Sequence, residues 1–107
     1  MLSEIPKVKT ESPLGVDSSF ESAAEAIYGS GNEVHYIVGS VFADQPGTLK
    51  VQFDDGSGDW DAEETKDYIA NTPQGFKVAV VSPYYRIKYV NGDTAQGTFR
   101  LKVWEVT

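Results

Sequence analysis

Short runs in which apolar and polar residues alternate cover the chain from residue 34 to its end. Six runs rich in β-branched and aromatic residues span residues 34–42, 49–53, 65–70, 76–80, 85–89 and 99–104. Because successive side chains of a strand point to opposite faces, a period of two predicts half-buried β-strands. Turn-forming residues separate the runs at short intervals, as is typical of sandwiches. We therefore predict an all-β fold, an antiparallel β-sandwich or jelly roll.

Turn residues predict how these strands are connected. Pro46 and Gly47 predict a tight turn with a positive φ at Gly47, so the strands on either side are expected to form a hairpin. Asp55-Gly56 lies within a loop over residues 54–59 and is a strong hairpin signal. Asn91-Gly92 predicts a further hairpin, between the last two strands.

The alternation also predicts which side chains are buried. The expected core residues, all after residue 32, are Leu49, Val51, Phe53, Phe76, Val78, Val80, Ile87, Phe99, Leu101 and Val103. Fully burying one such side chain contributes about 1.5 to 3 kcal/mol, so this set can support a small sandwich. None of these residues needs a functional role to explain it.

The first 28 residues lack the clear pattern of the rest. Residues 1–19 show no helical or strand period and contain Pro6 and Pro13, which predicts an extended N-terminal arm. Such an arm is either a frayed terminus or a segment that orders on a neighbouring subunit. Residues 20–28 suit a short helix or an irregular strand equally. The predicted organisation is an arm over residues 1–19 and a β-sandwich domain over residues 20–107.

Composition and charge exclude several classes of function. Sixteen acidic residues against nine basic ones give a net charge of −7, which disfavours a nucleic-acid partner. No apolar stretch is long enough to cross a membrane and no signal-peptide pattern is present, so we expect synthesis in the cytoplasm and no membrane partner. The chain has no cysteine, which leaves subunit contacts as a plausible additional source of stability.

No combination of residues predicts an active site. His35 is the single histidine and has no acid or nucleophile beside it in the sequence. The carboxylates of Asp59, Asp61, Glu63 and Glu64 lie too close together in sequence, in a solvated loop, to act as a glycosidase pair. We therefore expect no catalytic residues and a protein that is not an enzyme.

The sequence contains residues that could form a cation site or a sugar-binding surface. Asp55, Asp59 and Asp61 offer hard oxygen ligands, but their spacing is not that of an EF-hand, and an ordinary acidic loop is the preferred interpretation. We expect no bound metal and no cofactor. Four aromatic residues that could stack on sugars are Trp60, Tyr84, Tyr85 and Trp104. In a sandwich such residues more often belong to the core or to a protein interface.

Two blocks of sequence resemble a β-sandwich module that recurs in tailed-bacteriophage structural proteins. The first block is residues 41–53, with Ala43-Asp44-Gln45-Pro46-Gly47-Thr48-Leu49 at its centre, followed by Asp55-Gly56 and Asp59-Trp60-Asp61. The second is residues 84–101, with Tyr89-Val90-Asn91-Gly92 and Phe99-Arg100-Leu101. The likeness covers about residues 33 to 103, and the loop over residues 54–59 departs from the module's usual sequence. In both blocks the residues suggest structural roles, and Arg86 and Arg100 are expected to pair with nearby acids.

The resemblance implies a protein of the virion. It implies a capsid decoration (cement) subunit that binds the major capsid protein on the capsid exterior, and we expect a homotrimer whose arm reaches a neighbour or the shell. The alternative is a head-fibre or tail-associated adhesin module that binds host surface glycans. A non-viral carbohydrate-binding module is a third possibility.

Overall fold

The structure, a computed structural model, describes residues 6–26, 28–29 and 32–107. The described residues form strands and turns but no helix, so no helix capable of crossing a membrane occurs among them. The six long strands are β6 (Tyr36–Ala43), β7 (Gly47–Asp54), β8 (Ala62–Tyr68), β9 (Gln74–Ala79), β10 (Tyr84–Asn91) and β11 (Phe99–Val106). Five short strands precede them, namely β1 (Val8–Thr10), β2 (Ser19–Glu21), β3 (Glu25–Ala26), β4 (Tyr28–Gly29) and β5 (Asn32–Glu33). The six predicted strands are confirmed, and the segment left open between helix and strand contains strands.

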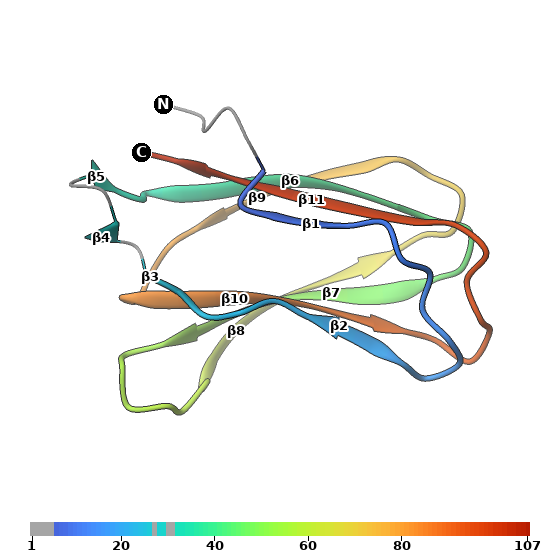
Figure 1. Cartoon of the computed structure of the whole chain (residues 1–107), viewed down its shortest axis with the longest axis horizontal. Coiled ribbons are helices and arrows are strands. Elements are labelled where there is room, and N and C mark those ends of the chain that lie inside the picture. The colour runs from blue at the N-terminus through green and yellow to red at the C-terminus, as the bar shows by residue number, and fades with distance from the viewer. Residues whose placement is uncertain (1–5, 27, 30–31) are drawn as a thin grey trace.

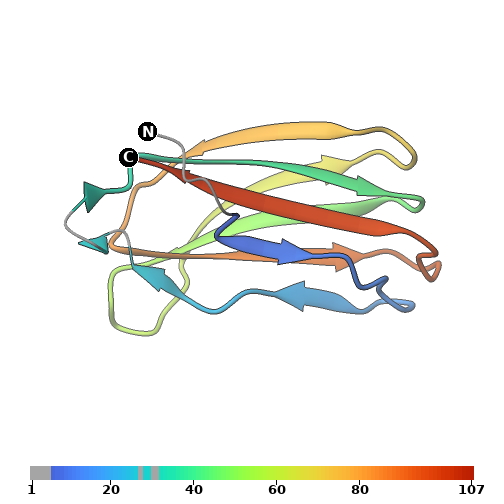
Figure 2. The ribbon, with the colours of Figure 1, turned by 45° about the horizontal axis from the view of Figure 1, so that its top comes forward.

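Two antiparallel sheets pack face to face and form a sandwich (Figures 1 and 2). Sheet A has the order β1-β11-β6-β9, and sheet B has the order β2-β10-β7-β8 with β3 also paired to β10. A small ribbon of β4 and β5 lies at one end of the sandwich. The predicted all-β antiparallel sandwich is therefore confirmed.

Most connections between the long strands cross from one sheet to the other. β7 and β8 form a hairpin around the loop that contains Asp55 and Gly56, as predicted. β6 and β7 lie in different sheets, and so do β10 and β11, so the hairpins predicted at Gly47 and at Asn91-Gly92 are wrong. Turn residues predict that the chain reverses, but the same reversal can join neighbours in one sheet or strands of two packed sheets.

The core fills the space between the two sheets. Nine of the ten predicted core residues are buried, and Val80 is partly buried against them. The structure adds eight further core residues: Val8, Val34, Ile37, Val41, Ala43, Tyr68, Tyr85 and Tyr89. Ile37 of β6 is buried, and Ile69, just after the end of β8, is exposed. The alternation shifts by one residue between Val34 and Ile37, where the chain leaves β5 and enters β6.

Residues 6–19 of the predicted arm lie against the sandwich of their own chain. β1 pairs with β11, and its Val8 is buried in the core. Further along, the backbone N–H of Leu14 donates to the side-chain oxygen of Gln96 at 2.8 Å, and the Asn91 amide donates to the carbonyl of Gly15, also at 2.8 Å. The expectation that the core begins after residue 32 is therefore wrong at Val8. Residues 1–5 of the arm lie outside the described residues.

Candidate interaction surface

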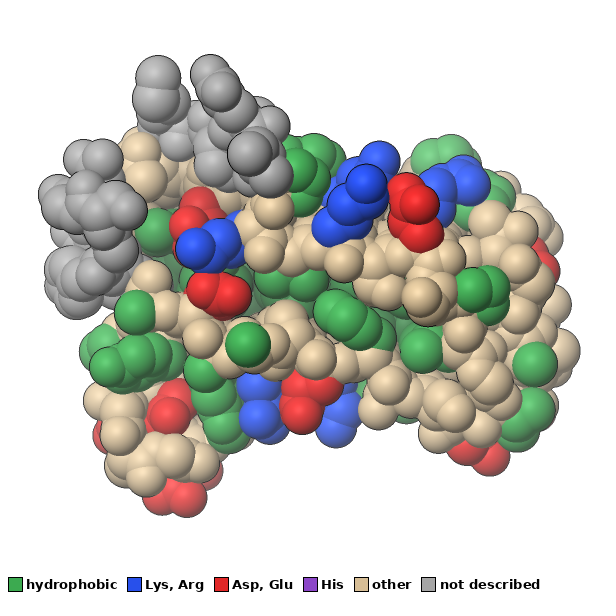
Figure 3. All heavy atoms as spheres, in the orientation of Figure 1, with side chains coloured by type: hydrophobic (Ala, Val, Ile, Leu, Met, Phe, Trp, Pro, Cys, Tyr) green, Lys and Arg blue, Asp and Glu red, His purple; other side chains and the backbone are tan. Residues whose placement is uncertain are grey.

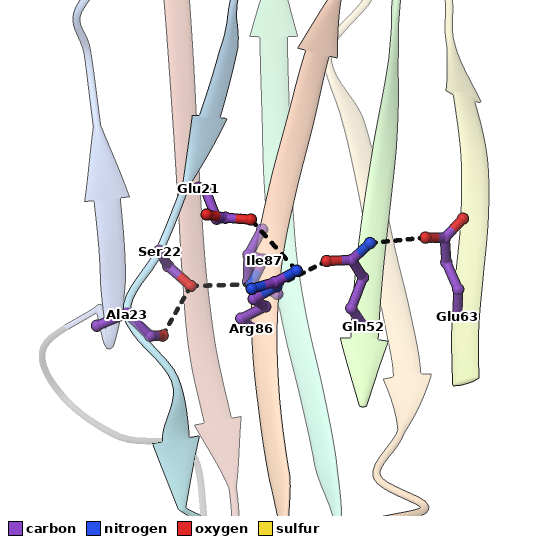
Figure 4. Close-up of polar contacts among 7 residues, drawn as sticks. All are labelled: Glu21, Ser22, Ala23, Gln52, Glu63, Arg86 and Ile87. Atoms are coloured by element: carbon purple, nitrogen blue, oxygen red, sulfur yellow. Dashed lines mark hydrogen bonds and ion pairs between the residues drawn. The ribbon is translucent and has the colours of Figure 1, made fainter. Parts of the chain in front are cut away.

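The outward face of sheet B carries a row of charged and polar side chains that bind one another (Figure 4). Arg86, in β10, lies 3.4 Å from Glu21 and donates through Nε to the side-chain oxygen of Gln52 at 2.7 Å. Gln52 in turn donates to Glu63 at 2.8 Å. This row crosses four neighbouring strands, from β2 to β8, and satisfies the charged groups within the sheet.

Further contacts complete the pairing on this face. Glu63 also accepts from Thr65 and lies 3.7 Å from Lys50. The hydrogen bond from Gln52 is the main reason why the pKa of Glu63 lies below its ordinary value. The Arg86 guanidinium stacks on Trp60, with 4.3 Å from its central carbon to the ring centroid. Four charged groups of this face, Glu21, Arg86, Glu63 and Lys50, therefore have partners within the sheet, whereas Lys88 and Asp67 have no ion pair among the described residues.

The outward face of sheet A has a different composition. Its outward strand positions carry Lys9 from β1; Arg100, Lys102, Trp104 and Val106 from β11; Tyr36, Val38, Ser40 and Phe42 from β6; and Gly75, Lys77 and Ala79 from β9. We call these twelve residues the sheet A face. They include four of the nine basic residues of the chain and none of its sixteen acids. A chain with a net charge of −7 thus presents one locally basic face.

Cross-strand register brings the aromatic and basic residues of the sheet A face together. Trp104 lies opposite Val38, which lies opposite Lys77 on the next strand. Arg100 lies opposite Phe42, and its guanidinium stacks on the ring with 4.6 Å to the centroid. Aromatic residues and Arg are the types enriched at protein interfaces.

The basic groups of this face are largely without carboxylate partners. Lys9 lies 4.0 Å from Glu11, and both side chains are more than half exposed, so this contact is weak. Within the described part of the chain, no ion pair joins Lys77, Arg100 or Lys102 to an acid. The predicted pairing is thus found for Arg86 and not for Arg100. In Figure 3 basic groups with acidic groups beside them project over β1 and β11, and acidic and basic groups also stand side by side over β2 and β10.

A shallow pocket opens on the sheet A face. Its volume is about 180 Å³, and its walls are Ser40, Val41 and Phe42 of β6, Arg100 and Lys102 of β11, and Pro73 before β9. Two cations and one hydroxyl therefore border the same small cavity. Alternation along the last strand places Arg100 and Lys102 outward. It does not predict the pocket, because Ser40 and Pro73 come beside these residues only through sheet pairing.

The other polar residues considered in the sequence lie elsewhere. His35 is exposed between β5 and β6, and its backbone bonds to Val80 and Val106. The carboxylates of Asp54 and Asp55 accept from backbone amides of their own loop, at Gly56, Ser57 and Gly58. These bonds lower the pKa of Asp55, with the bonds to Ser57 as the largest cause. Over residues 6–26, 28–29 and 32–107, no three His, Asp or Glu side chains are placed to hold a metal ion.

The four aromatic residues considered for sugar binding do not share one surface. Tyr85 is fully buried and donates from its hydroxyl to Glu105 at 2.7 Å. Burial, more than this bond, raises its pKa. Trp104 lies on sheet A, whereas Trp60 and Tyr84 lie at the outward side of sheet B. A sugar platform made from all four is therefore not formed.

Comparison with known proteins places the chain in a family. A family model described as the N-terminal domain of the uncharacterised protein YqxG matches residues 1–106. The chain belongs to this YqxG N-terminal domain family. No curated protein matches the sequence.

A solved structure with a similar fold is the crystal structure of the PBSX exported protein XepA. The TM-score is 0.83 at 23% sequence identity, over 92% of this chain and 37% of XepA. The chain therefore corresponds to a little over a third of XepA, and the likeness is one of fold.

Proposed function

We propose that this chain is a non-enzymatic binding module of a phage structural protein and that it attaches through the sheet A face. The observation that carries the proposal is the contrast between the two outward faces. On sheet B, Arg86 and Lys50 pair with Glu21 and Glu63, and acids stand among the bases. On sheet A, Lys77, Arg100 and Lys102 have no acid partner among the described residues and no acid stands beside them at an outward strand position. Aromatic residues and Arg are enriched at protein-binding surfaces, and the positive charges of this face complement an acidic partner.

The comparisons support a phage context for this proposal. XepA, which shares the fold, is a phage-related exported protein. The two sequence blocks that resemble phage structural modules lie in the sandwich, and the second contains Arg100. The family itself is described as uncharacterised, so its name adds no activity.

Within this function, capsid decoration is the specific role that we propose. A decoration subunit needs a rigid fold and one attachment surface on the major capsid protein, and the sandwich with its sheet A face supplies both. Acidic groups over the rest of the surface keep such a subunit soluble while it is free.

A second candidate is a module that binds the host surface. The name of XepA describes it as exported, which favours a partner outside the producing cell. Trp104 together with Lys77 could then contact an anionic surface glycan. This role differs from decoration in where the protein is found and in what it binds.

Co-sedimentation separates the two roles. We expect the purified 107-residue chain to pellet with phage heads that lack it and to remain in the supernatant with intact host cells or cell-wall fragments. Mass spectrometry of purified particles should then find it in the head fraction. Binding to cell walls with no binding to heads would contradict decoration and support the second candidate.

A further inference from the structure

We propose that the pocket between Arg100 and Lys102 is an anion subsite that receives the carboxylate of an acidic side chain from a protein partner. This inference rests on the proposed function, because it assigns the chemistry by which the sheet A face attaches. It names an occupant, an Asp or Glu side chain on the partner's surface.

The side chains of the pocket determine the charge of the occupant. Arg and Lys are donors only and carry no acceptor, so they suit a group that only accepts, such as a carboxylate. Ser40 adds a hydroxyl that can donate to the same group. No acidic side chain lines the pocket or stands at an outward strand position of the sheet A face. A neutral sugar needs acceptors as well as donors, and this pocket supplies few of them.

The size of the pocket limits the occupant to a small group. Its volume of about 180 Å³ lies below the roughly 300 to 1,000 Å³ of sites that hold drug-sized ligands. A single side chain fits such a space, whereas a nucleotide or a disaccharide would extend beyond it. The aromatic and apolar surface beside the pocket, Val38 and Trp104, can pack on the rest of the partner.

The guanidinium of Arg100 has a contact within the sheet A face. It lies over the Phe42 ring, with 4.6 Å from its central carbon to the centroid, and this contact does not use its N–H donors in a hydrogen bond to an acid. Lys102 is opposite Ser40 and half-buried, so its stem packs along the sheet. Both contacts reduce the side-chain entropy that is lost on binding, which favours affinity.

The charge of the whole chain favours a protein over a long polyanion. The sheet A face holds four bases and no acid, so the other residues carry sixteen acids against five bases, a net charge of −11. A nucleic acid or an anionic polysaccharide that continued past the face would meet this repulsion. A protein can confine its carboxylates to the area of contact.

The test measures binding of the full chain to a short poly-L-glutamate peptide, which does not extend beyond the sheet A face, and, separately, to phage heads that lack the protein. The variant Arg100→Glu with Lys102→Glu reverses both charges of the pocket. The matched control, Lys50→Glu with Lys88→Glu, makes the same change in net charge on the outward face of sheet B, where the two lysines lie opposite each other. A neutral pair, Arg100→Gln with Lys102→Gln, removes the donors' charge without reversal, and thermal unfolding verifies that each variant is folded.

We expect the pocket reversal to weaken polyglutamate binding at least about tenfold, as the loss of charge-assisted hydrogen bonds implies, and the neutral pair to weaken it less. The sheet B control should retain most of the binding, and added salt should weaken the wild type more than the pocket variants. Equal losses in the pocket reversal and the sheet B control would overturn the subsite.

The two arms of the test distinguish the subsite from the proposed function. Polyglutamate binding that depends on the pocket, without any binding to heads, would support the subsite and contradict decoration. Head binding that is unaffected by the pocket reversal would leave decoration standing and overturn the subsite. Tighter binding to single-stranded DNA or to polygalacturonate than to polyglutamate would overturn the assignment of a protein carboxylate.

Discussion

At the scale of single residues, Arg86 and Arg100 show how the same residue type acquires two roles. Each stands at an outward position of a long strand. Glu21 and Gln52 flank Arg86, so its charge is used within sheet B. Arg100 has Phe42 beside it and no carboxylate partner among the described residues, so its charge remains available. Register across the strands makes the difference, because directly opposed pairs determine which side chains interact.

Leu101 and its neighbour Lys102 test the assignment of the two sides of β11. Leu101 is fully buried, so Leu101→Ala should destabilise the fold by roughly 2 to 5 kcal/mol. Lys102 points outward, so Lys102→Ala should change the free energy of unfolding by no more than about 0.5 kcal/mol. Denaturant midpoints of the two variants measure both values. Equal effects would mean that the faces of β11 are reversed.

Tyr85 and Tyr89 should resist ionisation in the folded protein. Burial raises the pKa of both phenols above the ordinary value, which is about 10. Above that pH the unfolded chain releases these protons and the folded chain keeps them, so stability should fall as the pH rises beyond about 10.

An alkaline titration followed by tyrosinate absorbance should therefore show a late component, from Tyr85 and Tyr89, that ionises only on unfolding. The variant Tyr85→Phe removes one of the two late groups and serves as the control. Titration of all six tyrosines as one group, with the fold intact, would contradict the burial of both phenols.

At the scale of elements, β1 is part of the sandwich and contributes Val8 to the core. Val8→Ala should cost about 1 to 3 kcal/mol, since it removes part of a buried side chain beside Val103 of β11. The adjacent exposed Lys9 supplies the control, Lys9→Ala, which should be close to neutral. Chemical denaturation compares the two. A neutral Val8→Ala would mean that β1 does not form in solution, as expected of a free arm.

The elements also show how far the sequence determines the fold. Alternation predicted the six long strands and most of the core, because burial of one face imposes a period of two. It missed Val8, since a three-residue strand is too short to show a period. It could not predict that the chain crosses between sheets at Gly47. This residue does not take the predicted positive φ, and a Cβ there would lie 2.5 Å from the Tyr89 hydroxyl oxygen. Position 47 therefore requires glycine because Tyr89, which is 42 positions further along the chain, occupies the space of a Cβ.

The candidate site was less predictable than the fold for the same reason. The outward positions of Arg100, Lys102 and Lys77 follow from alternation alone. Their assembly into one face requires the strand order β1-β11-β6-β9. No two strands that pair in this order follow each other along the chain. Alternation therefore places single side chains outward without showing the surface that they form together.

At the scale of the whole molecule, the structure divides an acidic chain into one face of mixed and mostly paired charge and one basic, aromatic face. This division supports attachment through sheet A and leaves sheet B for solvent. The homotrimer predicted from the sequence stays a prediction, and the mass of the protein in solution tests it. A trimer that buried the sheet A face would compete with attachment to heads.

Labelling of single cysteines tests the attachment surface most directly, because the natural chain has no cysteine. Ser40→Cys places a thiol on the sheet A face beside Arg100 and Lys102, and Thr65→Cys places one at an exposed outward position of sheet B. The rate of maleimide labelling is measured for each variant, free and bound to phage heads. Attachment through sheet A predicts that binding slows labelling at position 40 and leaves the rate at position 65 unchanged. Slower labelling at position 65 with no change at position 40 would contradict the account.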